Sequence, residues 1–389
     1  MKILFVSPSF YPAFHYGGPT FINRSLCNGL GRIDGVDVEV LTTDANGPQR
    51  VDLTAAQANH CESYAITYCR RTFRPDIALG LLWRLPSMMR RADVVHLNGV
   101  YSFTTIPTLA LCRLLRKPLV WSTMGALQRW QGTTKQKRKA LWEKVCDSLC
   151  APETVVMHVT SEEERTESLE KIANAGAVVL RNGIDIPQLD LAHSETRSDV
   201  LRLLYLGRLH PIKGIENLLR ALPLAQTKIS LDICGEGDAQ YEARLRALVD
   251  ELDLTRTVRF HGRVDGDAKE DRFRAADLCI APSFKEAFCT VVLESMARAV
   301  PVIAGRGIPW KRIEEIGCGL WVDNEPLELA RAIDRAARMP LAAMGAKGRA
   351  WMQREYSWTD VAEEMCEVYR RMIRARRSGQ TTLEHAQES

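Results

Sequence analysis

Two carboxylates in apolar surroundings are the first residues of this sequence with clear chemical potential. Glu286 and Glu294 lie in KEAFCTVVLESMARAVPVIA, separated by seven mostly apolar residues. A buried charge is strongly unfavourable unless it is paired or bound to a ligand. Since a carboxylate can accept hydrogen bonds from two vicinal sugar hydroxyls, the two glutamates suit a polyol ligand. The alternative is that Glu294 forms a structural ion pair with a nearby Arg.

Two cations lie where an apolar run passes into a helical pattern, in LLYLGRLHPIKGIENLLRAL. Arg208 follows the run, and Lys213 precedes the helical pattern. Free N–H groups at a helix start favour an anion, and two added cations suit a diphosphate whose charge grows as it leaves. The alternative is that both are solvated loop charges.

Glycines and one histidine follow other apolar runs. Gly235 lies in CGEGD, and Gly17 and Gly18 lie in GGPT ahead of a helical pattern. Glycines allow a ligand to approach the backbone closely, although a glycine pair such as that of CGEGD is more often a plain tight turn, and a flexible loop explains GGPT equally well. His96 closes the run DVVHLNG, where it would point toward a cleft between two lobes, but a lone histidine is more often structural.

A regular alternation of elements must position these residues. Short apolar runs such as KILFVSP, DVVHLNG, LRLLYLG and PVIAG alternate with helical patterns in both halves of the chain. Nearly continuous apolar strands separated by helices predict parallel sheets that are covered on both faces. The expected fold class is therefore α/β, with two Rossmann-like, doubly wound lobes that face a central cleft. Ligands bind such sheets at the carboxyl ends of the strands.

The joint between the lobes is expected in the polar, aperiodic stretch IPQLDLAHSETRSD, which follows an Asn-Gly turn signal. The length of 389 residues also favours two domains. The predicted organisation is an N-terminal lobe over residues 1–186, a C-terminal lobe over 187–356, a helix over 357–377 that crosses between the lobes, and a disordered tail over 378–389.

Cysteine usage and hydropathy indicate a cytoplasmic protein. The eleven cysteines are scattered without a CxxC pair and sit in apolar runs, as expected of buried thiols in a reducing compartment. No apolar run is long enough to span a membrane, and the opening MKILFVSPSFYP is broken too early for a signal peptide. We therefore expect a cytoplasmic location, with at most peripheral contact with the inner face of the cell membrane.

Taken in order, the motifs resemble those of the retaining glycosyltransferases of family four, which have the two-lobed GT-B architecture. They run from KILFVSPSFYP and GGP through DVVHLNG, VTSEEE, NGIDIP and GRLHPIKG to the two glutamates and PVIAG. STMGALQRW and GIPW further resemble bacterial members that build exopolysaccharide or lipopolysaccharide. The resemblance implies a metal-independent hexosyltransferase that moves a sugar from a UDP- or GDP-linked donor to a glycan or lipid-linked saccharide. No cofactor beyond this co-substrate is expected.

The resemblance also implies roles for matching residues. Arg208 and Lys213 would hold the donor diphosphate; Glu286 would bind the hydroxyls of the donor sugar and Glu294 the ribose. The implied catalytic residues are Arg208, Lys213, Glu286 and His96. The donor site would further include Gly17, Gly18, Gly235, Val264 beside the base, and the backbone of Phe288, Cys289 and Thr290.

Departures from the family pattern fall at three of these places. The family usually has glycine where this chain has Ala287 and Cys289, so the donor loop is bulkier here. Asn98 stands where a second histidine is common, and STMGAL lacks the histidine that many relatives have after that strand.

The expected mechanism is front-face transfer with retention, in which the leaving diphosphate helps to deprotonate the acceptor hydroxyl while lobe closure excludes water.

A basic strip in the first half suggests where the acceptor meets the protein. Between Arg70 and Lys144 there are 15 Lys and Arg but only three acidic residues. Cations interleaved with tryptophans suit the headgroup zone of an anionic membrane, where a lipid-linked acceptor would lie. An ordinary solvated helix is the alternative. The residues predicted to serve the acceptor or the membrane are Arg129, Trp130, Lys137, Arg138 and Lys139.

Three other classes of protein compete with this interpretation. A nucleic-acid-binding protein would use the same basic strip, but no recognisable module or set of stacking aromatics accompanies it, so no nucleic-acid partner is expected. A nucleotide-dependent dehydrogenase needs a GxGxxG after the first strand, which SPSFYPAFHYGGP does not supply. A non-catalytic protein that binds nucleotide sugars is the remaining alternative.

Overall fold

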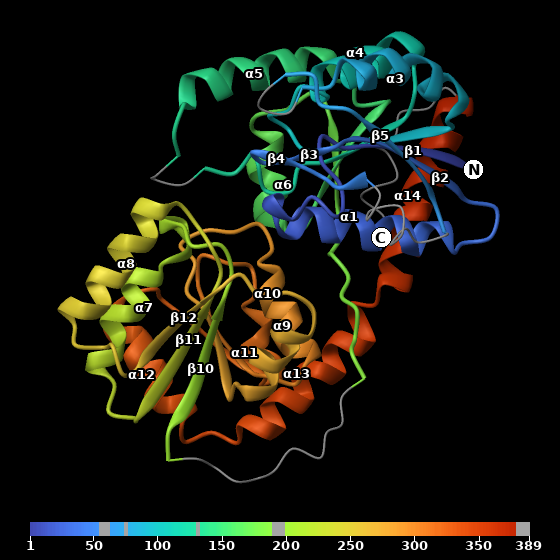
Figure 1. Ribbon diagram of the computed structural model, residues 1–389. Coiled ribbons are helices and arrows are strands. Elements are labelled where there is room, and N and C mark those ends of the chain that lie inside the picture. Colours follow the sequence, from blue (N-terminus) through green and yellow to red (C-terminus); the bar gives the residue numbers. More distant parts are fainter. Residues whose placement is uncertain (54–62, 74–76, 130–132, 189–198, 379–389) are drawn as a thin grey trace. The chain divides into compact units, whose positions relative to one another are not determined.

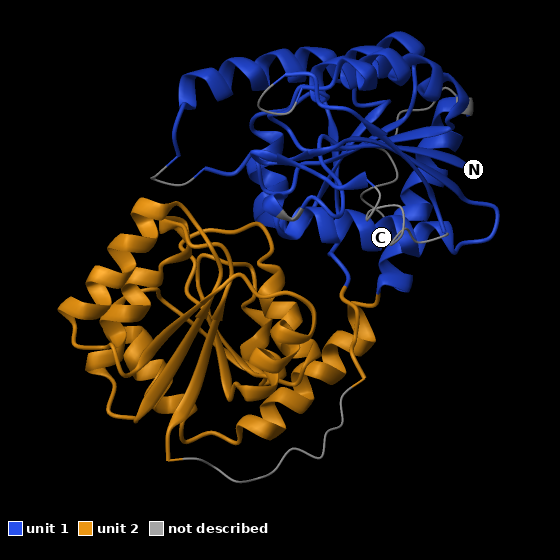
Figure 2. Ribbon diagram, viewed as in Figure 1, with its two compact units in different colours: residues 1–183, 358–389 blue, residues 184–357 orange. Residues whose placement is uncertain are grey.

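The computed structural model describes residues 1–53, 63–73, 77–129, 133–188 and 199–378. The chain forms two compact units, shown in Figure 2: unit 1 comprises Met1–Gly183 and Trp358–Ser389, and unit 2 comprises Ile184–Ser357. Each unit is a parallel sheet with helices on both faces, so the predicted α/β class with two Rossmann-like lobes is confirmed. Most of the predicted joint and nearly all of the predicted disordered tail lie outside the described residues.

The sheet of unit 1 has seven parallel strands in the order β5-β2-β1-β6-β7-β8-β9. Almost every residue of its central strands is buried, which is why these strands read as unbroken apolar runs. The strands are β1 (Lys2–Val6), β2 (Asp37–Thr43), β5 (Ala65–Cys69), β6 (Val94–Asn98), β7 (Leu119–Ser122), β8 (Val155–Val159) and β9 (Gly176–Val179), with a separate hairpin of β3 (Ala45–Asn46) and β4 (Gln49–Arg50).

Helices cover both faces of this sheet (Figure 1). On one face α3, α4 and α5 enclose an apolar cluster that includes Trp121, and on the other α1 and α14 enclose a second cluster that includes Phe5. The helices of unit 1 are η1 (Phe14–Tyr16), α1 (Gly18–Gly31), α3 (Leu79–Arg91), α4 (Thr105–Leu115), α5 (Gln136–Leu149), α6 (Glu162–Leu169) and α14 (Trp358–Ser378).

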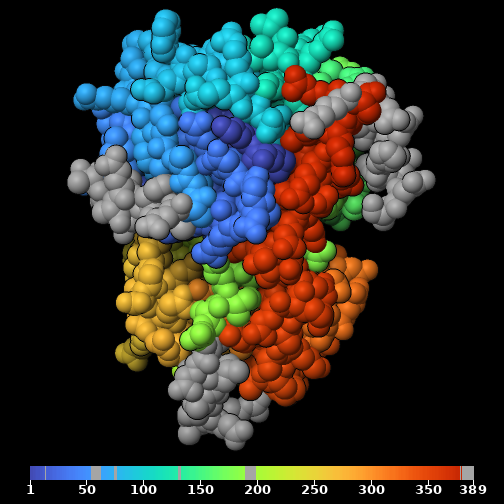
Figure 3. Space-filling view, turned by 90° about the vertical axis from the view of Figure 1, so that its right-hand side faces the viewer, coloured from blue at the N-terminus to red at the C-terminus, as the bar shows by residue number. Residues whose placement is uncertain are grey.

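Helix α14 returns to unit 1 from the far end of the chain and packs along α1 (Figure 3). The approach is close, because a Cβ added to Gly29 of α1 would lie 2.8 Å from Cβ of Ala362. Met365, Tyr369 and Met372 of α14 are buried in the cluster on this face. The helix that the sequence predicts over residues 357–377 is thus part of unit 1 by its contacts.

Unit 2 has a six-stranded parallel sheet in the order β12-β11-β10-β13-β14-β15. Helices α7, α8 and α12 cover one face, and α9, α10, α11 and α13 cover the other. The strands are β10 (Leu201–Leu206), β11 (Ile229–Cys234), β12 (Val258–Gly262), β13 (Leu278–Ala281), β14 (Val302–Gly305) and β15 (Gly319–Val322). The helices are η2 (Pro211–Lys213), α7 (Ile215–Ala221), η3 (Leu222–Leu224), α8 (Ala239–Glu251), α9 (Gly266–Ala275), α10 (Thr290–Ala297), α11 (Arg312–Ile316), α12 (Pro326–Ala336) and α13 (Leu341–Glu355).

Both sheets reverse their winding beside their first strand. In unit 1 the chain moves from β1 to β2 on one side and later to β6 on the other; in unit 2 it moves from β10 to β11 and later to β13. Such a reversal opens a crevice at the carboxyl ends of the two inner strands, which is where ligands bind in doubly wound sheets. Asn98 ends β6, and Glu286 follows β13, so each unit has polar residues at its own switch point.

Candidate functional site

The loop after β10 brings the two predicted cations to the switch point of unit 2. Arg208 is exposed two residues beyond the strand, and Lys213 ends the short helix η2. Gly214 follows with φ 67°, and a Cβ on it would lie only 2.2 Å from the carbonyl oxygen of Pro282. Only glycine fits there, so the backbone of this loop is fixed against the end of β13.

Lys213 and Glu286 meet directly. The Nζ atom of Lys213 lies 2.5 Å from Oε1 of Glu286, and the hydroxyl of Ser283 donates to the same oxygen over 2.6 Å. The two charged side chains are 19% and 18% exposed, so solvent and ligands can still reach them. The backbone N–H of Glu286 donates to Gly307, which holds the loop in place. The structure therefore joins the motif around Lys213 to the first of the two glutamates.

The electrostatics of this loop favour a bound anion. Burial alone would lower the pKa of Lys213, but the adjacent Glu286 carboxylate and its hydrogen bond raise it above its ordinary value, so Lys213 is charged. Burial, together with Arg208 and Lys213, lowers the pKa of His210, so its imidazole is neutral near pH 7. Its Nδ1 accepts from the N–H of Ile212, which leaves the proton of the neutral ring on Nε2.

Helix α10 starts beside this pair without a side-chain cap. Its N-cap residue, Cys289, has φ 63° and leaves N–H groups of the first turn free to bind an anion. Phe288 and Cys289 are 9% and 6% exposed, and the carbonyl of Phe288 accepts from the indole N–H of Trp310. Burial raises the pKa of the Cys289 thiol well above its ordinary value, so it stays protonated. Thr290 is the first residue of the helix.

Glu294 is the fifth residue of α10 and is also paired. Its Oε1 lies 2.7 Å from Nζ of Lys269 on α9, and the two side chains are 21% and 22% exposed. The structural alternative for Glu294 named an Arg as partner; the partner is Lys269 instead, while Arg298 pairs with Glu270 of α9. This pair is partly open to solvent, which leaves Glu294 accessible to a ligand.

Two further predicted donor residues of unit 2 have structural explanations. Gly235 has φ 151°, and a Cβ on it would lie 1.8 Å from the carbonyl oxygen of Gly207. The glycine is therefore required by the neighbouring strand end, whether or not a ligand approaches. Val264 follows β12, is half-buried, and packs against the apolar cluster below α10.

Gly17 and Gly18 belong to unit 1, whereas the other predicted donor residues belong to unit 2. Gly17 is the N-cap of α1, has φ 67° and lies in open space, because a Cβ on it would meet no heavy atom within 4 Å. The sign of φ, rather than crowding, makes glycine suitable there. Helix α1 has no side-chain cap, but Pro19 carries no N–H and the N–H of Thr20 donates to the carbonyl of Gly17, so its first turn offers fewer donors to an anion than the start of α10.

His96 lies in the core of unit 1 and is 0% exposed. Its ring stacks on Phe5 at 4.4 Å, Nδ1 lies 2.5 Å from the hydroxyl of Tyr369, and Nε2 lies 2.7 Å from the hydroxyl of Ser122. Both ring nitrogens are therefore engaged by side chains of the core. These contacts favour the structural alternative for His96 and give no support to its predicted catalytic role.

The hydrogen bonds around His96 run in one direction. Ser122 also contacts Nδ1 of His158 at 2.7 Å, and Nε2 of His158 lies 3.0 Å from the carbonyl oxygen of Leu180. Because a carbonyl only accepts, His158 must donate from Nε2 and accept from Ser122; Ser122 then accepts from His96, which accepts from Tyr369. Burial lowers the pKa of both histidines, so both rings are neutral and the chain of hydrogen bonds is complete.

Glu164 of α6 is a second buried polar centre of unit 1, and it is 0% exposed. Its carboxylate accepts from the hydroxyl of Thr123, the N–H of Gly125, and both the N–H and the hydroxyl of Thr160, at 2.6–2.8 Å. It thereby fixes the turn of the STMGAL stretch, in which Met124 has φ 50°. Among the described residues no cation pairs with this carboxylate; neutral donors alone satisfy it.

The predicted acceptor and membrane residues fall into two groups. Arg129 pairs with the buried Glu143 and donates to the hydroxyl of Tyr101, and Lys139 lies over the ring of Tyr101, 4.9 Å from its centroid. Lys137 and Arg138 are exposed on α5. Trp130 lies outside the described residues.

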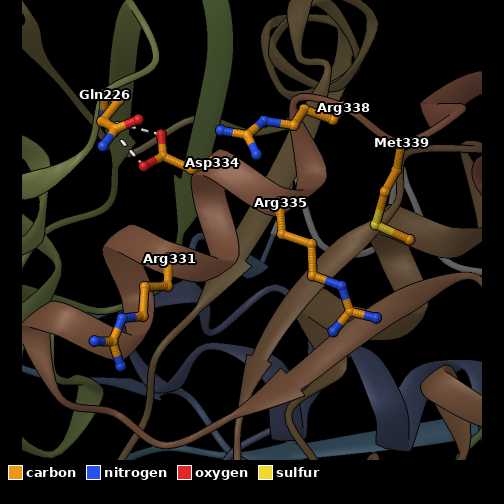
Figure 4. Close-up of a pocket in the computed structure, with 6 residues that line it drawn as sticks. All are labelled: Gln226, Arg331, Asp334, Arg335, Arg338 and Met339. Atoms are coloured by element: carbon orange, nitrogen blue, oxygen red, sulfur yellow. Dashed lines mark hydrogen bonds between the residues drawn. The ribbon is translucent and has the colours of Figure 1, made fainter.

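One surface cavity of unit 2 lies away from these residues. It measures about 440 Å³ and is open at the surface of unit 2, before the start of β11 and thus at the amino-terminal edge of the sheet. Asp334 in this cavity accepts from the backbone of Gln226, and the guanidinium groups of Arg331, Arg335 and Arg338 point in different directions (Figure 4). The cavity has no convergent set of groups and is not the candidate site.

Sequence reasoning missed three residues of the candidate site. Ser283 stands two residues after the end of β13 and three residues before Glu286, a position that signals a strand-end ligand. His210 stands between the two cations of the loop. Lys269 carries no such signal, because it is 25 residues from Glu294 and on another helix.

Family models match both units. Residues 16–188 match the model described as Glycosyltransferase Family 4, and residues 190–351 match the model described as Glycosyl transferases group 1. An uncharacterized glycosyltransferase of Methanocaldococcus jannaschii is 26% identical over 400 residues, covering 95% of this chain and 98% of that protein. A glycogen synthase of Mycobacterium tuberculosis is 31% identical over 319 residues, covering 76% of this chain and 73% of that protein.

A D-inositol 3-phosphate glycosyltransferase of Streptomyces griseus is 31% identical over 212 residues; the match covers 51% of this chain and 42% of that protein, so the chain spans less than half of this relative. Among solved structures, sucrose-phosphate synthase of Thermosynechococcus elongatus superposes with a TM-score of 0.74 at 22% identity, covering 96% of this chain and 100% of that one. HepE of Anabaena, solved in complex with UDP, superposes with a TM-score of 0.72 at 17% identity over 94% and 99% of the two chains. The chain therefore belongs to the group 1, family 4 glycosyltransferases and has the GT-B fold.

Proposed function

We propose that this chain is a retaining, metal-independent hexosyltransferase. It takes a UDP- or GDP-linked sugar and transfers the sugar to a glycan or lipid-linked saccharide in the synthesis of a bacterial surface polysaccharide. The observation that carries this proposal is the pair of Lys213 and Glu286, which meets at the switch point of unit 2 beside the uncapped start of α10. The complex of HepE with UDP supports a nucleotide-sugar donor for this fold.

The diphosphate of the donor would bind between the loop after β10 and the start of α10. Arg208 and Lys213 contribute two positive charges and Glu286 one negative charge, so these three side chains leave one positive charge in excess. Free N–H groups at the start of α10 add positive partial charge. These groups stabilise the charge that develops on the leaving diphosphate without a metal ion.

Donor binding would exchange the partners of two ion pairs. Lys213 pairs with Glu286, and Lys269 pairs with Glu294. A phosphate oxygen would take over Lys213, and the released Glu286 carboxylate would accept hydrogen bonds from hydroxyls of the sugar. Glu294 would likewise bind the ribose hydroxyls. The pairs keep the carboxylates neutralised and correctly oriented until the donor arrives.

Transfer would proceed on one face of the donor sugar. The bond between the anomeric carbon and the phosphate oxygen breaks, the bond to the acceptor oxygen forms, and the acceptor proton moves to the leaving phosphate. Lys213 holds that phosphate, and no side-chain base is needed. Nuclear magnetic resonance of the product measures the anomeric configuration. Retention is expected, and an inverted product contradicts the mechanism.

Donor binding is tested by thermal denaturation with a panel of UDP-, GDP- and ADP-sugars. One donor should raise the melting temperature of the wild type, and Glu294→Ala should abolish the shift. Glu270→Ala is the matched control, because it also breaks an ion pair of α9, with Arg298 at the C-terminal end of α10, but has no proposed contact with the donor. No shift with any donor contradicts the proposal, and a shift without sugar transfer to any acceptor favours the non-catalytic binding protein.

The acceptor side of the proposal rests on the helical layer of α3, α4 and α5. These helices carry eight Lys and Arg but only two acidic residues. Trp83, Leu114 and Leu141 project from them and are 88%, 78% and 66% exposed. Large apolar side chains among cations suit insertion into an anionic lipid surface. Trp142, a tryptophan among the cations of α5, instead turns inward, and its indole N–H donates to the carbonyl of Val100.

We therefore propose peripheral docking of unit 1 on an anionic membrane. None of the described helices is long and apolar enough to cross a bilayer. Sedimentation with phosphatidylglycerol vesicles should pull down the wild type at low salt and release it at high salt. Trp83→Ala combined with Leu114→Ala should weaken the binding at least fivefold, whereas Leu327→Ala, an exposed apolar residue of unit 2, should not. Equal binding of all variants contradicts docking through this layer.

A further inference from the structure

One face of the unit 1 sheet ends in a row of polar side chains. This face packs against α1 and α14, and upstream of the row it is apolar except for His96. Leu41 of β2 and Leu97 of β6 both pair with Val6 of β1, so the next residues of the three strands stand side by side. Asn98 also pairs with Ser122 of β7, and Ser122 with His158 of β8. The row is Thr42, Ser7, Asn98, Ser122 and His158.

The row is only partly satisfied by hydrogen bonds. Ser122 and His158 belong to the chain that leads to Tyr369, and the hydroxyl of Ser7 donates to the carbonyl of Ser9 over 2.6 Å. In contrast, the hydroxyl of Thr42 and both amide atoms of Asn98 have no partner among the described residues. The two side chains are 0% and 3% exposed, so solvent at the surface does not satisfy them.

A third such group faces the row from α1. The Oδ1 atom of Asn23 has no partner among the described residues, and the side chain is 3% exposed. Asn23 lies one helical turn before Cys27, which packs in the apolar cluster on this face of the sheet. Asn23 therefore points toward the sheet and toward the same edge as Thr42 and Asn98.

Buried polar groups without partners are rare, and each one in a native structure requires an explanation. Here they gather beside the point between β1 and β6 where the winding of the sheet reverses, the position at which doubly wound sheets bind ligands. The groups offered are two amide oxygens, one amide N–H₂ and one hydroxyl. This mixture of donors and acceptors matches ligand hydroxyls, which donate and accept, and it does not match an anion or a cation.

We propose that Asn98, Thr42 and Asn23 form a subsite of unit 1 that binds hydroxyl groups of a neutral sugar. This inference rests on the proposed function, because it assigns that sugar to the acceptor of the transfer reaction. Asn98 is the central residue, since its amide donates to one ligand oxygen and accepts from another.

The test uses the full chain and saturation-transfer nuclear magnetic resonance with a panel of monosaccharides and cyclitols. At least one should bind the wild type, and Asn98→Leu should weaken its binding at least tenfold. Thr42→Val provides a second variant of similar shape in case Asn98→Leu does not fold. Ser168→Ala on α6 is the matched control, because its hydroxyl is also buried without a partner among the described residues but lies away from the row.

Melting temperatures separate a binding role from an internal defect. Because Asn98→Leu removes unsatisfied groups, it should leave the melting temperature unchanged or raise it while sugar binding is lost. Two results overturn the inference. In the first, no member of the panel binds the wild type, which means that the row holds only water. In the second, the Asn98→Leu variant binds the sugar as well as the wild type does. The nucleotide-sugar shift that depends on Glu294 is measured on the same variants. If the wild type binds neutral sugars but shows no nucleotide-sugar shift, the proposed function is contradicted while the subsite of unit 1 is not.

Discussion

The two units are the same kind of sheet with opposite kinds of polar chemistry at their switch points. In unit 2 the polar groups are charged, paired with each other and about one-fifth exposed, as in Lys213–Glu286 and Lys269–Glu294. In unit 1 they are neutral, almost fully buried and partly without partners, as at Asn98 and Thr42. The fold therefore fixes where a ligand binds, whereas the residues at the edge select a charged or a neutral one.

The two units also differ in the groups that bind their carboxylates. Unit 2 neutralises Glu286 and Glu294 with lysines that can change partners. Unit 1 surrounds Glu164 with neutral donors and no cation among the described residues, and so holds a fixed turn. An ion pair at a partly exposed edge is weak and exchangeable, while a buried carboxylate with four donors is rigid.

The largest expected effect concerns the ion pair between Lys213 and Glu286. Lys213→Met removes the cation that stabilises the leaving diphosphate, so kcat/KM for sugar transfer should fall on the order of 10²–10³-fold. Steady-state kinetics with the donor found by thermal shift measures this change. Arg202→Met is the control, because it breaks the pair with Asp277 at the opposite edge of the same sheet. A Lys213→Met variant with at least one-third of wild-type activity would falsify the role of Lys213.

For Glu164, the rigid carboxylate of unit 1, we expect a substitution to lower the stability of the fold. Glu164→Gln presents an amide N–H₂ to N–H and hydroxyl donors, so unit 1 should lose about 2–4 kcal/mol of unfolding free energy. Glu294→Gln should cost about 1 kcal/mol or less, because its ion pair is partly exposed. Urea denaturation measures both values. Similar losses for the two variants would remove the distinction between rigid and exchangeable carboxylates.

Acid should destabilise unit 1 more steeply than unit 2, because unit 1 holds two fully buried histidines whose pKa is lowered, whereas the described residues of unit 2 hold one, the half-buried His210. Burial lowers the pKa values of His96 and His158, so below pH ~6.5 the unfolded chain binds more protons than the folded chain. Stability should then fall by about 1.4 kcal/mol per pH unit for each histidine. Glu355 of unit 2 responds at lower pH. Burial alone would raise its pKa, but hydrogen bonds from Trp351, Arg312 and Arg354 lower that pKa to about 2. The contribution of Glu355 to the stability of unit 2 is therefore lost only on further acidification.

Hydrogen exchange at pH 7, 5.5 and 4.5 resolves the two units and checks this order. A double variant, His96→Gln with His158→Gln, should lose the pH dependence of unit 1 between pH 6.5 and 4.5, because amides do not titrate in this range, while unit 2 keeps the contribution of His210. Acid-induced opening that begins in unit 2 contradicts the assignment of the pH dependence to the buried histidines. A double variant whose stability falls with pH as steeply as that of the wild type contradicts it as well.

The smallest expected effect is none at all. Since unit 2 supplies its own cations at the diphosphate position, removal of divalent metal with EDTA should leave the transfer rate within twofold of the untreated enzyme. The measurement is the initial rate before and after chelation and again after Mg²⁺ is added back. A loss that Mg²⁺ restores would show that Arg208 and Lys213 are not sufficient and would overturn metal independence.

Local sequence predicts a good part of this molecule. Buried parallel strands are apolar along their whole length, so runs such as KILFVSP and PVIAG identify β1 and β14. Parallel strands also bring their carboxyl ends together, which is why Lys213 and Glu286 could be assigned to one edge although 73 residues separate them.

Contacts that depend on helix packing were not predictable. Lys269 and Glu294 meet because α9 and α10 lie side by side, and nothing in either helix specifies that neighbour. The same limit applies to tryptophans: Trp83 is exposed and Trp142 turns inward, although both lie among cations in the sequence. The role of His96 depended on Tyr369, which is 273 residues away.

The return of α14 to unit 1 has a consequence for biosynthesis. His96 and the apolar face around it are synthesised before unit 2, but Tyr369 and the other buried residues of α14 are synthesised after it. At a synthesis rate of roughly 5–20 residues per second, that face stays uncovered for about 15–55 s, during which all of unit 2 is translated. A nascent chain therefore carries an open apolar groove that a chaperone can occupy, and a chain that stops before α14 never closes it.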